Sequence, residues 1–250
     1  TFALVMDAAA QGPDVPPELR GLVGKITEKG RNYYSPVGLI VTQNAAGEVS
    51  LGTGTVIDGG FVLTAAHVVE DAVRAKFFYG GVGGREFSPT SKTIHPYYRD
   101  PRSGQGNKIN YQFDLAVLNL NLNRNLLGGQ FNPNAPDPQR IQSLALPYNS
   151  QTSKGDNILF VGFGNQGNGS IGELPAVSQD QTKHYGWSKV DCDNGDGYLG
   201  FRFDRGEAII GRGDSGGPVL DSSTIVRSPN GVYRGATIVG VNSHVFAREN

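Results

Sequence analysis

Short apolar runs separated by glycines, prolines and polar residues form the hydrophobic pattern of this chain. The runs are rich in Val, Ile, Leu, Thr and Phe, which is typical of β-strands joined by turns. Only the segment "AAHVVEDAV" has a spacing that fits a turn or two of helix, at 65–73. The sequence therefore predicts an all-β protein, with strands at 37–42, 52–58, 61–65, 114–120, 157–163, 216–221 and 235–243.

The predicted strands fall into two groups, separated by the polar, proline-rich segment "GGQFNPNAPDPQR". A chain of 250 residues can bury the cores of two lobes, each of about 100 residues. We predict an N-terminal β-barrel at 31–127, a linker at 128–143 and a C-terminal β-barrel at 144–250. Residues 1–30 are predicted to be a leader or pro-segment, of which 1–20 are extended and lie outside both lobes.

Composition and charge exclude several classes of partner. The formal net charge is -1 and the basic residues are scattered, so no nucleic-acid partner is expected. No apolar stretch approaches the roughly 20 residues that span a bilayer, so no membrane partner is expected either. Cys192 is the single cysteine, which excludes a disulfide within the chain. Because Thr1 stands where an initiator Met would be, we expect a processed form.

Ser215 is the candidate nucleophile and lies in the small-residue segment "GRGDSGGPVL". A serine hydroxyl reacts only when a base takes its proton, and that base needs an acid to hold its ring. His67 in "VLTAAHVV" is the candidate base, and Asp114 in "YQFDLAVLNL" is the candidate acid. Taken singly, His67 is better explained as a packed core histidine, Asp114 equally well as a turn-capping aspartate, and Ser215 could be a turn residue.

Three segments in this order, "TAAHV", "FDLAVL" and "GDSGGP", resemble the trypsin-like (chymotrypsin-fold) serine peptidases. The segments "LGTGTVIDGGFVLTAAHVV", "TIHPYY" and "ATIVGVNS" extend the resemblance over roughly 36–245. It implies a fold of two six-stranded-type antiparallel β-barrels. It also implies a serine endopeptidase that acts on proteins or peptides without a cofactor or a metal.

The resemblance also implies a role for each residue of the site. Ser215 attacks the substrate carbonyl, His67 moves the proton, and Asp114 orients the imidazole. The amides of Gly213 and Ser215 form the oxyanion hole, and the glycines allow the tight backbone path that this requires. Asp214 is implied to accept an ion pair that holds this loop in its working shape.

The segment "RGLVGK" is an imperfect counterpart of the family's activation site. Cleavage after Gly21 would free the amine of Leu22 to pair with Asp214, which would make the intact chain a zymogen. The alternative is a simple strand in "RGLVGK" with no activation cleavage, in which case Asp214 has another partner.

Substrate selection is implied to depend on residues around the serine and on a strand near the C-terminus. Counting back from Ser215 without a gap places Ile209 at the floor of the specificity pocket, and Val245, two residues after Ser243, would lie on its wall. Such a pocket favours substrates with small or medium apolar side chains before the cleaved bond. A gap in "FDRGEAIIGRG" would instead bring Glu207 to the pocket and favour basic ones. Ser243 is implied to seat the substrate backbone and Asp114, and Arg212 is counted with the substrate-binding residues.

Three positions depart from the family's pattern. Gly52 and Val68 occupy the places of the usual disulfide at the histidine loop. His244 stands where an aromatic residue is usual, as a substrate contact or as a surface histidine. The sequence stops soon after Val245, so we expect an incomplete second barrel whose last segment is missing, cleaved off or supplied by another chain.

The resemblance further implies a secreted or periplasmic protein, with a protein inhibitor as a further partner. The competing interpretation is a binding or regulatory module that keeps the fold without turnover. Two other motifs carry less weight. "GFGNQG" is interpreted as a glycine-rich loop because no helix follows it, and "DCDNGDG" lacks the acid spacing of a calcium loop. His95 and His184 are expected to be structural or surface residues.

Overall fold

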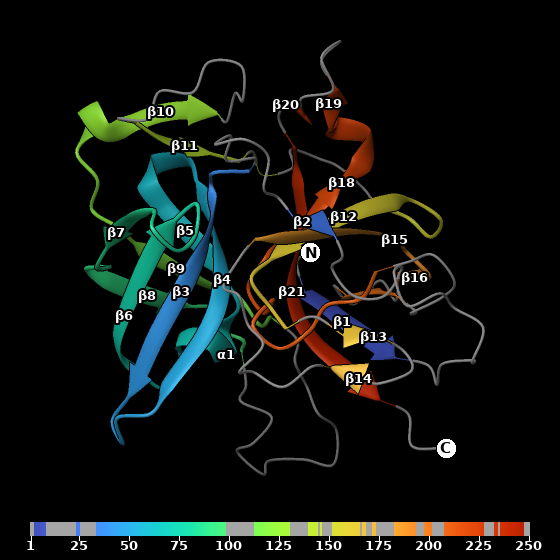
Figure 1. Ribbon diagram of the computed structural model, residues 1–250, viewed down its shortest axis with the longest axis horizontal. Coiled ribbons are helices and arrows are strands. Elements are labelled where there is room, and N and C mark those ends of the chain that lie inside the picture. The colour runs from blue at the N-terminus through green and yellow to red at the C-terminus, as the bar shows by residue number, and fades with distance from the viewer. Residues whose placement is uncertain are drawn as a thin grey trace.

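Two curled β-sheets make up almost all of the regular structure, and they lie on the left and right of Figure 1. The computed structural model describes residues 3–8, 24–25, 34–98, 113–130, 140–144, 146, 152–165, 167–168, 172–173, 183–193, 198–201, 208–227, 233–234 and 236–247. The prediction of an all-β double-barrel architecture is confirmed. Within these residues no helix is long and apolar enough to cross a membrane.

The first sheet is antiparallel throughout and contains seven strands. In spatial order they are β7 (Arg85–Phe87), β6 (Ala72–Tyr79), β3 (Val37–Asn44), β4 (Val49–Ile57), β5 (Phe61–Thr64), β9 (Ala116–Asn119) and β8 (Ser91–Ile94). The short helix α1 (Ala66–Val69) follows β5 directly, and the 3-10 turn η2 (Asp58–Gly60) joins β4 to β5.

The second sheet contains eight strands, and β1 within it runs parallel to both of its neighbours. In spatial order they are β16 (Cys192–Asp193), β17 (Tyr198–Gly200), β1 (Ala3–Ala8), β21 (Ile238–Ala247), β18 (Pro218–Asp221), β12 (Asn157–Gly162), β15 (His184–Lys189) and β2 (Gly24–Lys25). Smaller elements are β10 (Leu127–Gln130) with β11 (Ile141–Ser143), β13 (Gly167–Asn168) with β14 (Gly172–Glu173), β19 (Val226–Arg227) with β20 (Tyr233–Arg234), and the 3-10 turns η4 (Arg124–Leu126) and η6 (Ser222–Thr224).

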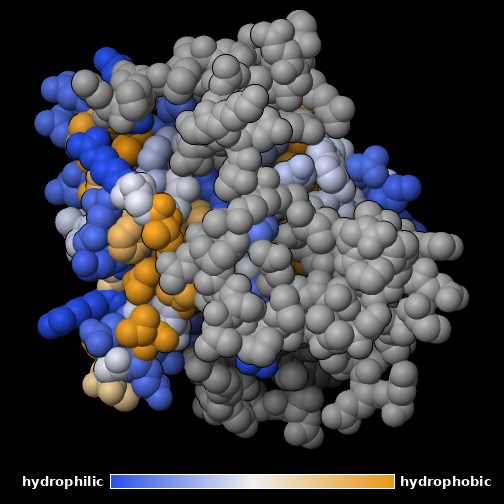
Figure 2. Space-filling model, in the orientation of Figure 1, coloured by the Kyte–Doolittle hydropathy of each residue, from blue (hydrophilic) through white to orange (hydrophobic). Residues whose placement is uncertain are grey.

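A shared hydrophobic core joins the two sheets. Leu39 and Leu63 of the first sheet are buried in one cluster with Leu159, Val161 and Leu220 of the second. Apolar burial of this kind is the main favourable contribution to folding, so this shared cluster stabilises the association of the two lobes. On the outer face of the first sheet, apolar residues lie among polar ones, as the left side of Figure 2 shows.

The prediction of a turn or two of helix within 65–73 is confirmed as a single turn. Only Ala66–Val69 is helical, and β6 begins at Ala72. In β6 the charged side chains of Arg74 and Lys76 alternate with less exposed residues, which is the period of a strand and not of a helix. Pairing of β6 with both β3 and β7 holds this segment in the sheet.

Two predictions about the connecting segments need correction. Residues 1–20 do not all lie outside the lobes, because Ala3–Ala8 forms a strand between β17 and β21. An edge of β21 that offers unpaired backbone groups is the physical reason that this apolar segment joins the sheet. The predicted linker at 128–143 begins and ends in strands, since β10 and β11 pair with each other; residues 131–139 are outside the described part.

Candidate active site

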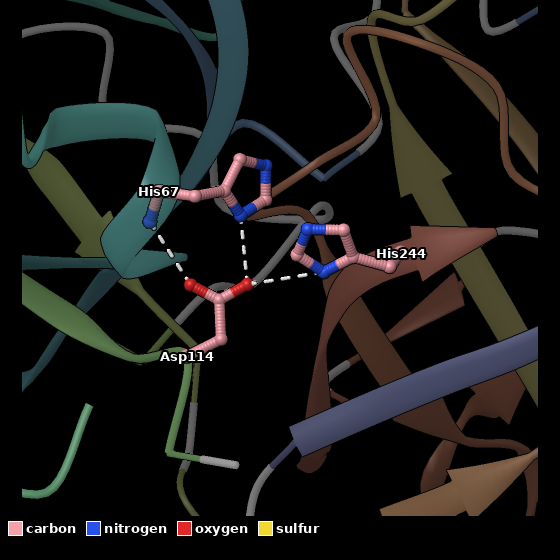
Figure 3. Close-up of side chains that lie close together, drawn as sticks. All are labelled: His67, Asp114 and His244. Carbon is pink, nitrogen blue, oxygen red and sulfur yellow. Dashed lines mark hydrogen bonds and ion pairs between the residues drawn. The ribbon is translucent and has the colours of Figure 1, made fainter. Parts of the chain in front are cut away.

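Two adjacent strands of the first sheet bring His67 and Asp114 together. His67 lies on α1, directly after β5, and Asp114 lies just before β9, which pairs with β5. The fully buried carboxylate of Asp114 accepts the backbone N–H of His67 at 2.9 Å on Oδ1. Its Oδ2 lies 2.7 Å from Nδ1 of the same imidazole, as Figure 3 shows. Asp114 therefore holds both the backbone and the ring of His67.

The Asp114 carboxylate is ionised despite its burial. Burial alone raises the pKa of Asp114, but hydrogen bonds from His67 and Ser243 and the charge interaction with His67 outweigh it, so the pKa lies below its ordinary value. An ionised carboxylate can only accept hydrogen bonds. Nδ1 of His67 is therefore the donor in this contact, and in the neutral imidazole Nε2 is the acceptor nitrogen.

Ser243 on β21 links this pair to the second sheet. Its hydroxyl donates to Oδ2 of Asp114 at 2.5 Å, and its carbonyl oxygen accepts the hydroxyl of Ser215 at 3.4 Å. Among the described residues no hydrogen bond joins Ser215 directly to His67. The contacts in the structure therefore bring Ser215 to the cluster through Ser243. Catalytic hydrogen bonds are often long or poorly aligned before substrate binds.

A β-bulge places Ser243 where it can make both contacts. In the pairing of β1 with β21, Leu4 is opposite Asn242 and Val5 is opposite His244, so Ser243 has no partner. An unpaired residue of this kind bends the strand and changes the direction of nearby side chains. As a result, both Ser243 and His244 contact Asp114, although neighbours in a regular strand point to opposite faces.

The loop that carries Ser215 is bonded to the first sheet through Thr53 on β4. The N–H of Thr53 donates to the carbonyl oxygen of Ser215 at 2.8 Å, and the Thr53 hydroxyl donates to the carbonyl oxygen of Gly213 at 2.8 Å. A Cβ at Gly216 would overlap the Thr64 hydroxyl and the Thr53 carbonyl oxygen. Glycine is therefore required at 216 for the loop to lie this close to the first sheet.

The backbone of this loop leaves two amides without partners. Gly213 has a φ of 98°, a conformation that glycine adopts far more readily than other residues. Within the described part of the chain, the N–H groups of Gly213 and Ser215 donate no hydrogen bond. Two such amides in one tight turn can stabilise a negatively charged oxygen.

Asp214, the acid directly before the nucleophile, is fully buried. Its carboxylate accepts the backbone N–H of Gly164 at 2.7 Å and that of Gly211 at 2.9 Å. These bonds tie the serine loop to the segment that follows β12. Leu22, the predicted partner of Asp214, lies outside the described residues, and β2 begins two residues after it and pairs with β15.

The surface interpretation of His244 is wrong, because its side chain is only 20% exposed and lies against the His67–Asp114 pair. Its Nδ1 lies 2.5 Å from the Ser243 hydroxyl and 3.6 Å from Oδ2 of Asp114. Burial, together with the nearby His67, lowers the pKa of His244 to about 3, although the Asp114 charge acts in the opposite direction. His244 is therefore neutral at neutral pH.

The other predicted substrate-binding residues have no described hydrogen bond or ion pair with His67, Asp114 or Ser215. Ile209 is partly buried and packs against the core beneath the second sheet, and Arg212 is exposed, with its carbonyl oxygen bonded to the N–H of Asn165 at 2.7 Å. Val245 lies on β21, but its side chain is outside the described part, as is all of Glu207. Of the remaining histidines, His184 is buried on β15 and His95 stacks on Phe113.

Comparisons with known proteins identify the fold and the family. The family model for trypsin matches residues 29–250. A search of curated proteins gives no match. Among solved structures, one described as "Structure of GrC" is 18% identical, with a TM-score of 0.56 over 86% of this chain and 92% of its own. A serine endoprotease from Yersinia pestis is also 18% identical, with a TM-score of 0.45 over 76% of this chain and 51% of its own. At 18% identity the likeness to the first of these structures is one of fold.

Proposed function

Because this chain belongs to the trypsin family, we propose that it is a serine endopeptidase that hydrolyses peptide bonds through an acyl-enzyme. The family that the sequence resembles is thereby confirmed. The observation that supports the activity is the pair of hydrogen bonds between Asp114 and His67, one from the backbone N–H and one at Nδ1. This contact leaves Nε2 as a base on the imidazole.

The proposed reaction begins when the hydroxyl of Ser215 leaves the Ser243 carbonyl and turns toward His67. Its oxygen attacks the substrate carbonyl carbon while Nε2 of His67 takes the proton, and the charge of Asp114 stabilises the imidazolium. The amides of Gly213 and Ser215 bind the oxygen that becomes negative. His67 then protonates the leaving amine, which yields the acyl-enzyme. Water, deprotonated by the same imidazole, releases the acid.

Labelling by a fluorophosphonate tests this proposal directly, because the reagent reacts only with an activated serine. We expect the full chain to be modified at Ser215, as located by mass spectrometry of its peptides. The matched control is Ser215→Ala, which should stay unlabelled. Absence of label on a folded wild-type chain would instead favour the competing function, a binding or regulatory module with the trypsin-like fold.

We further propose that the substrate residue before the cleaved bond is small or medium in size and apolar. Support comes from the apolar environment of Ile209, which packs against a hydrophobic cluster that includes its chain neighbours Ala208 and Ile210. A charged substrate side chain would find no partner among these groups, and a buried unpaired charge is costly.

A peptide-library cleavage profile measures this preference. We expect cleavage after residues such as alanine, valine or leucine. Cleavage chiefly after lysine or arginine would contradict the preference and would point to Glu207 as the residue that selects the substrate. Either outcome leaves the proposed hydrolytic activity intact.

A further inference from the structure

The C-terminal part of β21 lies between the loop of the nucleophile and the N-terminal strand β1. On one side, Asn242 accepts the N–H of Gly216 at 2.8 Å and donates its own N–H to the carbonyl oxygen of Gly217 at 2.8 Å. On the other side, residues 242–247 pair with β1. Figure 1 shows β1 alongside β21. This edge of β21 is therefore covered by the chain's own N-terminal strand.

The same part of β21 presents a backbone acceptor beside the nucleophile. The carbonyl oxygen of Ser243 lies 3.4 Å from the hydroxyl oxygen of Ser215. In the proposed reaction that hydroxyl turns toward His67, which leaves the carbonyl oxygen to another donor. A peptide N–H that donates to it, at about 2.9 Å, brings the main chain of its own peptide within reach of Ser215. A substrate that pairs with β21 at residue 243 is thus placed for attack.

The main chain of β1 already passes this position. Leu4 is the register partner of Asn242, and Val5 is that of His244. The peptide bond between Leu4 and Val5 therefore lies opposite Ser243. Extended peptides commonly bind proteins by adding a strand to a sheet edge, where main-chain hydrogen bonds provide the affinity. One row of backbone groups pairs with one strand only, so a substrate can add to β21 here only after β1 has left.

We propose that the edge of β21 at 242–247 is the docking edge for an extended substrate peptide and that residues 3–8 occupy it, so that the chain inhibits its own peptidase activity while β1 is paired. Two features make β1 displaceable. In the described part of the chain it pairs with β17 only at Ala3 and Leu4, so β21 provides most of its partners. It also runs parallel to β21, and parallel pairs are slightly less stable per residue than the antiparallel pairs that a substrate can form. The inhibition rests on the proposed function, whereas the docking edge does not.

Proline substitution within β1 tests the inhibition in the full chain. Successive N–H groups of a strand face opposite edges, so Val5→Pro together with Met6→Pro removes one donor toward β21. We expect kcat/KM for peptide hydrolysis to rise about tenfold or more, because the apparent affinity for substrate scales with the fraction of chains whose edge is open. The matched control, Val5→Ala with Met6→Ala, keeps both N–H groups and should hydrolyse peptide at close to the wild-type rate. A proline variant no faster than this control would contradict the inhibition.

Fluorophosphonate labelling of the same variants separates this inference from the proposed function. Labelling needs Ser215 and His67, neither of which pairs with β1, so the proline variant and the wild type should be labelled at the same rate. Equal labelling also shows that the proline variant has kept its site. Equal labelling without a gain in peptide hydrolysis would overturn the inhibition and support the peptidase.

Binding of the synthetic peptide "TFALVMDAAA" tests the docking edge without any measurement of activity. A tethered segment acts at an effective concentration of about millimolar, so the peptide is titrated to that range. Fluorescence anisotropy should detect binding to the proline variant and not to the wild type, whose edge is occupied. Peptide binding by a chain that is never labelled would support the docking edge and contradict the peptidase. A labelled proline variant that binds no peptide would contradict the docking edge.

A disulfide between β1 and β21 makes the opposite change. Asp7 and Phe246 are register partners, and neighbouring strands lie about 4.8 Å apart, within the Cα separations that a disulfide bridges. With Cys192→Ser to remove the other thiol, Asp7→Cys and Phe246→Cys together should slow peptide hydrolysis about tenfold or more when oxidised, and reduction should restore it. The control, Asp7→Cys with Cys192→Ser, should be unaffected by oxidation. Hydrolysis that the closed disulfide leaves unchanged would overturn the proposal.

Discussion

His67→Ala is expected to lower kcat for a cleaved peptide by about 10⁶-fold, the loss typical when the base of such a triad is removed. Without the imidazole of His67, the base that Asp114 orients is lost. The neighbouring His244 is a much weaker base, because burial lowers its pKa to about 3, so Ser215 keeps its proton. Its hydroxyl is bonded only to the Ser243 carbonyl oxygen, which is an acceptor but not a base at neutral pH. The measurement is the initial rate of peptide hydrolysis, normalised to the amount of folded protein.

The matched control for this loss is His95→Ala, which removes a histidine that stacks on Phe113 and that, in the described part of the chain, has no hydrogen bond or ion pair with the Asp114 carboxylate. It should leave kcat within about twofold of the wild type. That is far less than the tenfold change in rate that about 1.4 kcal/mol of activation free energy produces. Circular dichroism checks that both variants fold, which we expect because His67 is partly exposed. A His67→Ala variant that retains more than a hundredth of the wild-type rate would contradict the role of His67 as the base.

Asp114→Asn is the second large effect, with an expected loss of about 10⁴-fold in kcat, as in chymotrypsin-type triads. An asparagine amide that donates to Nδ1 of His67 leaves the proton on Nε2, where it blocks transfer from Ser215. The substitution also removes the charge that stabilises the imidazolium. The carboxamide has nearly the shape of the carboxylate, so the packing around residue 114 is retained.

The control for charge alone is Asp156→Asn, at an exposed turn where the carboxylate accepts the N–H of Ser153. That variant should hydrolyse peptide at the wild-type rate. The pKa of Asp114 is held below its ordinary value, so the carboxylate is ionised throughout the neutral range and the loss should persist at every neutral pH. Residual activity within tenfold of the wild type would show that Asp114 does not set the tautomer of His67.

Several features of the fold were predictable because they depend on local sequence. The segments at 37–42 and 157–163 are short and rich in apolar residues, and both form strands with nearly the predicted bounds. By contrast, Ala3–Ala8 was assigned to a leader. Its membership of the second sheet depends on a free edge of β21, a segment more than two hundred residues away in the chain.

His244, which lies beside Asp114, shows why the sequence could not place every residue of the candidate site. His244 follows Ser243 directly, and strict alternation along a strand predicts opposite directions for the two side chains. The bulge opposite Leu4 and Val5 removes that alternation. No local pattern in "VNSHVF" signals the bulge, since it is a property of the pairing between two strands.

The sequence alone determined the all-β class and the family to which His67, Asp114 and Ser215 point. These depend on the spacing of apolar residues and on turn chemistry within a few positions. Only the tertiary structure decided that one carboxylate is shared by His67, Ser243 and His244. Its contact with Ser243 joins residues 129 positions apart. Which distant groups meet is determined by strand pairing and by burial, and neither is encoded in any single segment.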